Sequence, residues 1–358
     1  MNFTLHLTAD CNFACRYCYE KHTPARMDER TALAACELLF SYGHRKNGFS
    51  FFGGEPLLLK DVIGLVVHNC AEKAAKAGSS MSYQLTTNGS LLNEAFLRLA
   101  DAHGIRIALS HDGCLQDEQR LLRGGGGTAA LLEPKIDMLL AHQPNAVAMM
   151  TIEKRNLPRL AEAVKWLYAR GFSRVNTAID YRPSVDWNDD DMAELGLQYG
   201  ELAVFAAEHF DDERPLHYLN FESKVAAYIN GRRCIECELG MKQPSIAPDG
   251  VIYPCNQFVG VPEFAMGNVF DGIDKAAQRR IYEAYRAPEP TCEGCALDAR
   301  CRHHCACLNF SMTGDMHTVP PVQCAHERAV IKYADRMAEL LYERKSPRFM
   351  RVYGNTEE

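Results

Sequence analysis

The chain has 358 residues, of which 47% are hydrophobic and 24% charged, with 39 basic against 46 acidic side chains. This much apolar material supports a sizeable core and excludes general disorder. The net charge of −7 gives no positive field that would attract nucleic acid or an anionic membrane. At about 150 residues per domain, we expect one large domain and a smaller one.

The cysteines suggest where the protein works. The chain contains 15 cysteines. The N-terminus has no basic segment followed by a long apolar run, and no 18-residue apolar stretch occurs anywhere. We therefore expect a cytoplasmic protein, in a reducing compartment where clustered cysteines more often bind metal than form disulfides.

The first 210 residues alternate between short apolar runs and segments of helical period. Six such β/α units with right-handed crossovers predict an α/β fold, a partial (β/α)6 barrel resembling an open TIM barrel. The predicted strands are 3–7, 49–52, 82–85, 105–109, 146–151 and 174–179, and the predicted helices are 28–42, 61–76, 92–103, 128–142, 157–169 and 191–210. In such folds the loops after the strands carry the chemistry.

From residue 220 the pattern becomes short and irregular and contains most of the remaining cysteines. Residues 245–247 and 251–253 flank Pro248-Asp249-Gly250, which predicts a strand, a turn and a strand. A long helix is expected over 325–343. We predict a barrel domain over 1–215, a small irregular α+β domain over 216–330, and a C-terminal helix and tail over 331–358.

A C-x3-C-x2-C motif follows the first predicted strand and consists of Cys11, Cys15 and Cys18. Three thiolates can hold three irons of a 4Fe-4S cube, whereas a closed electron-transfer cluster usually takes four. The fourth iron would then be open to substrate or cofactor. The spacing and its position after a strand predict a cluster with an open corner.

This motif resembles the signature of radical S-adenosylmethionine (SAM) enzymes, in which an aromatic residue precedes the last cysteine, here Tyr17. The resemblance extends to Gly53-Gly54-Glu55-Pro56 after the second strand, similar to the family motif that contacts the methionyl amine. Glycines let backbone approach a ligand, and a carboxylate suits an ammonium. As a bare tetrapeptide the same sequence is compatible with a simple turn.

Weaker matches follow in family order. Asn88 lies in Thr87-Asn88-Gly89 after the third strand, and Ser110 follows the fourth and resembles the family's polar contact to the cofactor. Either residue is also compatible with a helix cap or a turn. Four glycines at 124–127 lack the Lys-Ser/Thr pair of a Walker motif, so we expect a loop before a helix capped by Thr128.

Near the C-terminus, C-x2-C-x5-C-x3-C is preceded by Cys237 and Cys255 and followed by Cys324. This composite resembles the SPASM extension of radical SAM enzymes, which holds two auxiliary 4Fe-4S clusters. The resemblance assigns to the first auxiliary cluster Cys234 or Cys237, or both, with Cys255 and Cys305. It assigns to the second Cys292, Cys295, Cys301 and Cys324. The leading pair of the first cluster is closer in sequence here than is common in the family.

The alternative for these cysteines is a zinc ribbon, which His303 or His304 could join. Four cysteines remain outside all three proposed clusters. Cys36 and Cys70 fall on helical patterns and are expected to be small core residues. Cys114 follows the fourth strand and is a candidate for a redox or substrate role, and Cys307 is expected to be inert.

The resemblance implies that the open iron chelates SAM, and that one electron cleaves it to methionine and a 5'-deoxyadenosyl radical that removes a hydrogen atom from substrate. SPASM enzymes mostly act on peptides, so we expect a maturase that installs a thioether or carbon–carbon crosslink in a ribosomally made peptide. With ten residues before Cys11, leader recognition would fall to the barrel, the cluster module or a separate leader-binding protein. A flavodoxin or ferredoxin is the expected reductant.

The first alternative is the related sulfatase-maturing class, which oxidises Cys or Ser to formylglycine. In that class an aspartate after the cysteine corresponding to Cys255 serves as base, whereas this chain has Asn256. An amide accepts no proton at neutral pH. Epimerases and decarboxylating relatives stay open, as does a nonenzymatic iron–sulfur carrier or zinc module, although a carrier has no use for an open iron.

Overall fold

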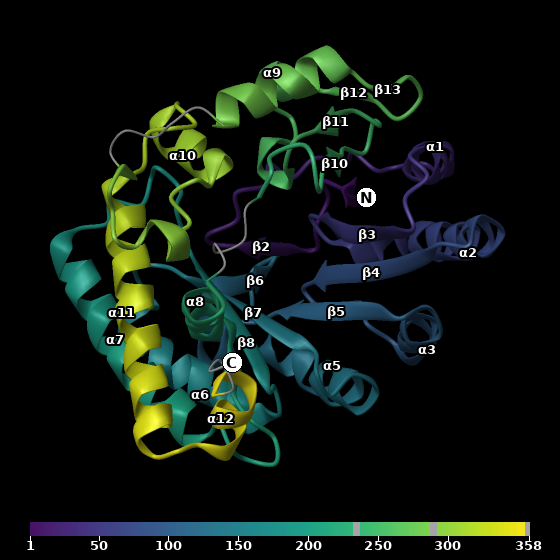
Figure 1. The fold of residues 1–358 in the computed structure, drawn as a ribbon. Coiled ribbons are helices and arrows are strands. Elements are labelled where there is room, and N and C mark those ends of the chain that lie inside the picture. The colour runs from purple at the N-terminus through teal and green to yellow at the C-terminus, as the bar shows by residue number, and fades with distance from the viewer. Residues whose placement is uncertain (232–236, 287–291, 355–358) are drawn as a thin grey trace. The chain divides into compact units, whose positions relative to one another are not determined.

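The computed structural model describes residues 1–231, 237–286 and 292–354, which form two compact units. The first contains residues 1–110, 120–143 and 237–287, and the second contains 111–119, 144–236 and 288–358. Both are built on mostly parallel strands with helices packed against them, as the alternating sequence pattern predicts (Figure 1). Within the described ranges, no helix combines the length and apolar character needed to cross a membrane.

The sheet of the first unit runs in the order β11-β10-β1-β3-β4-β5. All neighbours pair in parallel except β10 and β11, which form the predicted antiparallel hairpin. Its strands are β1 (Asn2–Thr8), β3 (Lys46–Gly53), β4 (Ser80–Thr87), β5 (Ile105–Ser110), β10 (Ser245–Ile246) and β11 (Ile252–Tyr253). Because β10 pairs with β1, with Leu5 opposite Ile246, the hairpin extends the sheet that carries the cysteine loop.

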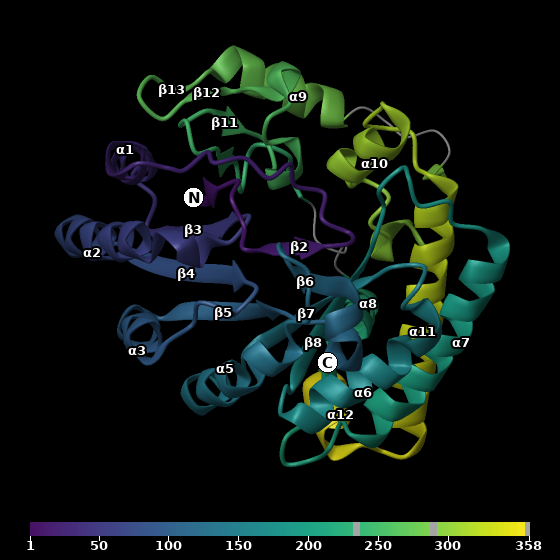
Figure 2. The same cartoon turned by 180° about the vertical axis from the view of Figure 1, so that it is seen from behind.

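Along one side of the strands lie, one after another, α1 (Glu29–Ser41), α2 (Lys60–Ala77), α3 (Glu94–His103) and α5 (Ala129–His142) (Figures 1 and 2). Helix α9 (Lys275–Arg286) lies apart from them, nearer to the β10–β11 hairpin. Asp28 and Asn93 cap α1 and α3 through their side chains, which satisfies backbone donors left free at a helix start. Thr128 stands before α5 but donates its hydroxyl to Arg120 O at 2.6 Å, so the predicted Thr128 side-chain cap is wrong.

Two short antiparallel pairs complete the first unit. They are β2 (Phe13–Cys15) with β6 (Arg120–Leu122), and β12 (Gly267–Asn268) with β13 (Gly272–Ile273). Strand β2 contains Cys15, which lies opposite Arg120. The cysteine loop is therefore held by a strand pair as well as by β1.

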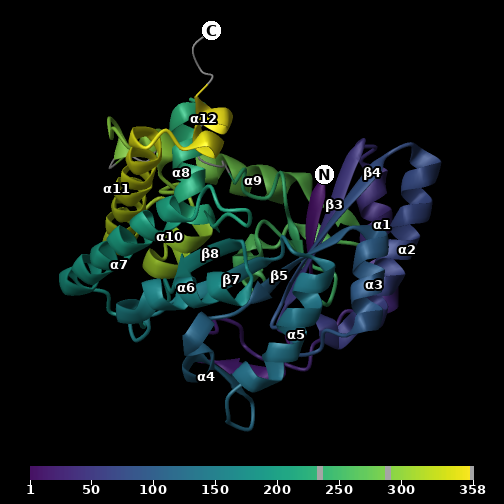
Figure 3. The ribbon, with the colours of Figure 1, turned by 90° about the horizontal axis from the view of Figure 1, so that it is seen from below.

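The second unit has three parallel strands in the order β7-β8-β9. They are β7 (Val147–Ile152), β8 (Arg174–Ile179) and β9 (His217–Tyr218). Its helices are α4 (Gln116–Gln119), α6 (Leu160–Arg170), α7 (Asp189–Glu208), α8 (Leu219–Ile229), α10 (Ala306–Thr313), α11 (Pro321–Glu343) and α12 (Pro347–Tyr353). Helices α7 and α11 lie side by side in every view (Figure 3). Helices α8, α9 and α10 occupy parts of the chain whose sequence pattern is irregular.

Candidate functional site

The C-x3-C-x2-C loop follows β1 and includes strand β2. The backbone N–H of Cys18 donates to Cys15 O at 3.1 Å, and that of Phe13 donates to Cys11 Sγ at 3.4 Å. Burial raises the pKa of Cys11 to about 12, and the nearby charges of Glu55, Cys15 and Cys18 add to this. The three sulfurs are thus close enough to interact, and a positively charged metal centre would offset the cost of deprotonating them.

Gly53 and Gly54 lie against the backbone that leads into Cys11. A Cβ at Gly53 would stand 2.4 Å from Thr8 O, and one at Gly54 would stand 2.2 Å from Asp10 O. Gly53 also has φ +126°, where side chains are disfavoured. The N–H of Gly54 donates to Thr8 O at 2.7 Å. These glycines therefore permit a close approach to the protein's own cysteine loop.

Glu55 is completely buried, and its carboxylate is surrounded by donors from the chain. Its Oε1 accepts hydrogen bonds from Leu57 N at 2.9 Å and Thr87 Oγ1 at 2.7 Å, and its Oε2 accepts one from Asn88 N at 2.8 Å. Burial raises the pKa of Glu55 to about 7, although these hydrogen bonds oppose the rise. The carboxylate ties the turn after β3 to the end of β4.

Asn88 connects the end of β4 to the cysteine loop. Its Nδ2 donates to Cys11 Sγ at 3.7 Å and to Asn12 Oδ1 at 2.9 Å, while its Oδ1 accepts from Ser90 N at 3.0 Å. A hydrogen bond to a cysteine sulfur is one of the means by which proteins tune an iron–sulfur cluster. The structure thus brings together the cysteine loop, the glycine turn with Glu55, and Asn88.

The other predicted cofactor residues have different surroundings. Tyr17 is buried, and the guanidinium of Arg120 lies 5.2 Å from the centre of its ring. Pro56 is buried at the start of the 3-10 helix η1 (Pro56–Leu59), and Ser110 is the half-buried last residue of β5. Contact of Tyr17, Pro56 and Ser110 with SAM stays a prediction.

The cysteines assigned to the first auxiliary cluster are divided between the two units. Cys237 is exposed, and Cys255 is half-buried with its Sγ 3.2 Å from Asn256 Oδ1. Cys305, in the second unit, lies with its Sγ 3.6 Å from Cys307 Sγ. Cys234 lies outside the described residues. This ligand set stays a prediction.

The cysteines assigned to the second auxiliary cluster all belong to the second unit. Arg328 Nε donates to Cys324 Sγ at 3.5 Å, and this bond raises the pKa of Arg328, with further contributions from the charges of Cys324, Cys295 and Cys301. Cys301 in turn interacts electrostatically with Cys292. Three of the four sulfurs that the sequence resemblance groups together thus interact with one guanidinium, and Cys292 interacts with one of those three.

The geometry also bears on the zinc alternative. Across residues 1–231, 237–286 and 292–354, no three His, Cys, Asp or Glu side chains are arranged to hold a single metal ion. Tetrahedral zinc needs its sulfur ligands within about 3.8 Å of one another, from a Zn–S distance of about 2.3 Å. Each iron of a cube takes only one cysteine, so its ligands are spaced more widely. The auxiliary-cluster ligands and the zinc alternative both stay predictions.

The remaining cysteines have distinct environments. Cys36 and Cys70 are fully buried on α1 and α2 with their sulfurs 3.5 Å apart, which confirms their prediction as core residues. Cys114 lies beside Glu162, with Arg159 donating to its Sγ at 3.8 Å. Burial and the Glu162 carboxylate raise the pKa of Cys114 to about 11, which disfavours a reactive thiolate.

Several residues of these sites escape a sequence-based search. Asn12 contacts the predicted cofactor residue Asn88, and only its position directly after Cys11 could have indicated it. Lys224 and Glu327 surround Cys301, yet they lie 103 positions apart. No spacing pattern joins residues so distant in sequence.

Fold and site together define an α/β protein in which a three-cysteine loop follows the first strand and meets a glycine-rich turn after the next strand of the sheet. The model of the Radical SAM superfamily matches residues 5–196. The chain therefore belongs to the Radical SAM superfamily and is a radical SAM enzyme, which implies a 4Fe-4S cluster and SAM.

Curated relatives extend beyond that region. The serine-type anaerobic sulfatase-maturating enzyme of Klebsiella aerogenes is 26% identical over 326 residues, covering 82% of this chain and 76% of the relative. The GTP 3',8-cyclase of Rhizobium meliloti is 30% identical over 194 residues, covering 51% of this chain and 52% of the relative. The first similarity covers much more of the chain than the second.

Solved structures share the fold along nearly the whole chain. The structure described as native anSMEcpe with bound AdoMet and Cp18Cys peptide has a TM-score of 0.80 at 16% identity, with 99% of each chain covered. SuiB of Streptococcus suis bound to precursor peptide SuiA has a TM-score of 0.62 at 15% identity, covering 90% of this chain and 75% of SuiB. The similarity to both confirms the predicted α/β fold and the C-terminal helices.

Proposed function

We propose that this radical SAM enzyme is a maturase that installs a thioether or carbon–carbon crosslink in a ribosomally synthesised peptide. The observation that carries the proposal is the fold similarity over nearly the whole chain to two enzymes whose structures contain bound peptides. A similarity confined to residues 5–196 would indicate only the superfamily.

The first site has the parts that this chemistry needs. When bound there, the cluster and SAM supply a 5'-deoxyadenosyl radical that removes a hydrogen atom from the substrate. Cys11, Cys15 and Cys18 would hold the cluster, and Asn88 would donate to the Cys11 sulfur as it does here. Glu55, Thr87 and Asn88 keep the glycine turn and the end of β4 fixed beside that loop.

We further propose two auxiliary 4Fe-4S clusters in the C-terminal region, with the ligand sets given by the sequence resemblance. The interactions of Cys324, Cys295 and Cys301 with Arg328, and of Cys292 with Cys301, support the second set. Such clusters would accept the electron left on the substrate or bind a substrate thiolate. A flavodoxin or ferredoxin in the cytoplasm would supply the initial electron.

A second candidate is formylglycine formation on a sulfatase. The sulfatase-maturating relative, similar over 82% of this chain, favours it as much as the peptide-bound structures favour crosslinking. Asn256 counts against it, because the amide beside Cys255 accepts no proton at neutral pH. This candidate therefore requires a base other than residue 256.

Anaerobic incubation with SAM, a reductant and either type of peptide distinguishes the candidates. We expect 5'-deoxyadenosine together with a peptide that has lost two hydrogens and whose fragmentation is blocked between the joined residues. Formylglycine would instead react with a hydrazide, because it carries an aldehyde. Hydrazide-reactive product from a sulfatase peptide, with no crosslink in peptides encoded beside this gene, would contradict the crosslinking proposal.

A further inference from the structure

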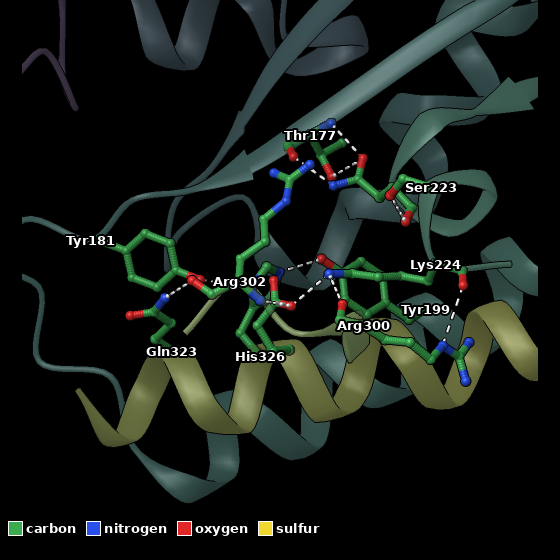
Figure 4. Close-up of polar contacts among 11 residues, drawn as sticks. Thr177, Tyr181, Tyr199, Ser223, Lys224, Arg300, Arg302, Gln323 and His326 are labelled. Carbon is green, nitrogen blue, oxygen red and sulfur yellow. Dashed lines mark hydrogen bonds and ion pairs between the residues drawn. The ribbon is translucent and has the colours of Figure 1, made fainter. Parts of the chain in front are cut away.

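The segment Arg300–Arg302 is anchored on both sides of Cys301. The Lys224 ammonium donates to Arg300 O at 2.7 Å. The N–H of Arg302 donates to Glu327 Oε2 at 2.9 Å, and Arg302 O accepts from Gln323 Nε2 at 2.8 Å. Backbone atoms before and after this cysteine are therefore fixed by three side chains of the same unit (Figure 4).

Two of these anchors are oppositely charged and buried. Lys224 Nζ lies 2.6 Å from Glu327 Oε2, and their side chains are 2% and 7% exposed. Burial alone would raise the pKa of Glu327, but the neighbouring Lys224 charge and hydrogen bonds lower it below its ordinary value. Replacing such a pair with apolar residues is often neutral or stabilising. The pair is therefore better explained by the geometry that it imposes than by its stabilising energy.

Helix α11 supplies two of the three anchors, Gln323 and Glu327, and also a predicted cluster ligand. Gln323 and Glu327 are four residues apart, so they share one face of the helix, and Cys324 follows Gln323 directly. The helix that positions Cys301 through its flanking peptides thus carries Cys324 itself. This fixes the two cysteines relative to each other independently of any metal.

The rotation of α11 about its axis is set by His326, which directly precedes Glu327. Buried His326 is bonded through Nδ1 to the Tyr181 hydroxyl at 2.7 Å and through Nε2 to the Tyr199 hydroxyl at 2.9 Å. Tyr199 belongs to α7, and Tyr181 follows β8 (Figure 4). Because both ring nitrogens are engaged, turning α11 about its axis would break both hydrogen bonds, of which the one to Tyr199 is buried.

We propose that the buried Lys224–Glu327 pair, together with Gln323, is a positioning device that holds Cys301 and Cys324 in place for a shared iron–sulfur cluster. The inference rests on the proposed second auxiliary cluster. It assigns Lys224 and Glu327 to the support of a metal centre, since residues that orient metal ligands strongly affect metal binding.

The test uses the full-length chain with Cys11, Cys15 and Cys18 replaced by Ala, so that only auxiliary iron remains. Into this parent we introduce Lys224→Met with Glu327→Met, which removes both charges and the bonds to residues 300 and 302 while keeping similar volume. The matched control is Lys165→Met with Glu201→Met, an exposed pair with Nζ and Oε1 2.5 Å apart. Iron, acid-labile sulfide and the EPR spectrum of the reduced protein are compared, with near-UV circular dichroism reporting folding.

The expected result is a folded double variant that loses about half of the auxiliary iron and one of two EPR signals, whereas the control keeps both. A folded double variant with the parent's iron and spectrum overturns the proposal. If the double variant does not fold, Glu327→Gln is tested instead, because it keeps the shape of the side chain but removes its charge. An unchanged EPR spectrum of this variant overturns the proposal, and an altered EPR spectrum supports it. Absence of auxiliary iron from the parent overturns it too, whereas failure to modify a peptide bears only on the proposed function.

Discussion

At the scale of single residues, close backbone contact determines how the first site is built. Gly54 has an ordinary φ, so its requirement is steric: the position of an added Cβ is already 2.2 Å from Asp10 O. The backbone N–H of Glu55 also donates to Asp10 O at 2.9 Å, which holds the glycine turn against the segment that enters Cys11. Any side chain at Gly54 must therefore displace the segment that enters Cys11.

We predict that Gly54→Ala lowers the free energy of unfolding by about 1–3 kcal/mol, as overpacking does, and reduces 5'-deoxyadenosine formation. Auxiliary iron should stay bound. Gly64→Ala is the control, because Gly64 lies on helix α2 and its added Cβ would meet only Leu99 Cδ2, at 3.9 Å. This variant should stabilise the protein by about 1 kcal/mol. Denaturant titration and anaerobic SAM cleavage measure both effects, and wild-type cleavage by Gly54→Ala would contradict this account.

The sequence identifies the residues of this site better than it identifies their partners. The motif marks Glu55, and chemistry suggests an ammonium as its partner, yet in the structure its carboxylate accepts hydrogen bonds from Leu57, Thr87 and Asn88. Two of these donors are the last residue of β4 and the residue after it, more than 30 positions away. Sequence spacing cannot predict such partners, because they depend on which strands become neighbours in the sheet.

At the scale of elements, regular periodicity was enough to predict the six main strands and the helices between them. Strands β2 and β6 escape prediction because three residues carry too little pattern, and only their mutual pairing makes them strands. Helix α8 buries Lys224 between apolar residues such as Phe221 and Val225. A lysine on the inward face breaks the apolar stripe by which amphipathic helices are predicted.

The packing of α11 on α7 depends on two small residues. Gly196 and Gly200 lie one turn apart on α7 and face Tyr333 of α11. A Cβ at Gly200 would stand 3.2 Å from Tyr333 Cε1, whereas one at Gly196 would stand 3.4 Å from its hydroxyl oxygen. The glycines let the helix that carries Cys324 lie close to α7.

We therefore expect Gly200→Leu to destabilise the protein by about 1–3 kcal/mol, because the larger side chain must push Tyr333 and α11 away. Gly196→Ala serves as the control and should gain up to about 1 kcal/mol from helix propensity. Chemical denaturation monitored by circular dichroism measures both. Equal stability of Gly200→Leu and the wild type would show that the contact between α7 and α11 is not tightly packed.

At the scale of the whole molecule, the cysteines fall into groups that the sequence distinguishes and the structure partly describes. The first three share one loop of the first unit, and three more interact with Arg328 in the second. The set assigned to the first auxiliary cluster draws on both units. Sequence resemblance supplies that assignment, because a cluster bound by distant segments leaves no local pattern.

The separation of these groups predicts that the radical site and the auxiliary sites can be uncoupled. Replacing Cys11, Cys15 and Cys18 together by Ala should abolish SAM cleavage and remove about one third of the iron, if each of three cubes holds an equal share. The control removes two other thiols, with Cys36→Ala and Cys70→Ala, which are buried side by side on α1 and α2. It should keep all of the iron.

The triple variant and the control are compared after anaerobic purification. Iron and sulfide analysis measures the clusters, and chromatography detects 5'-deoxyadenosine. Cleavage by the triple variant would mean that the open iron belongs to another cysteine group. Loss of all iron from the same variant would mean that the auxiliary clusters do not assemble independently, and that metal binding at the N-terminal loop is a condition for folding the rest of the chain.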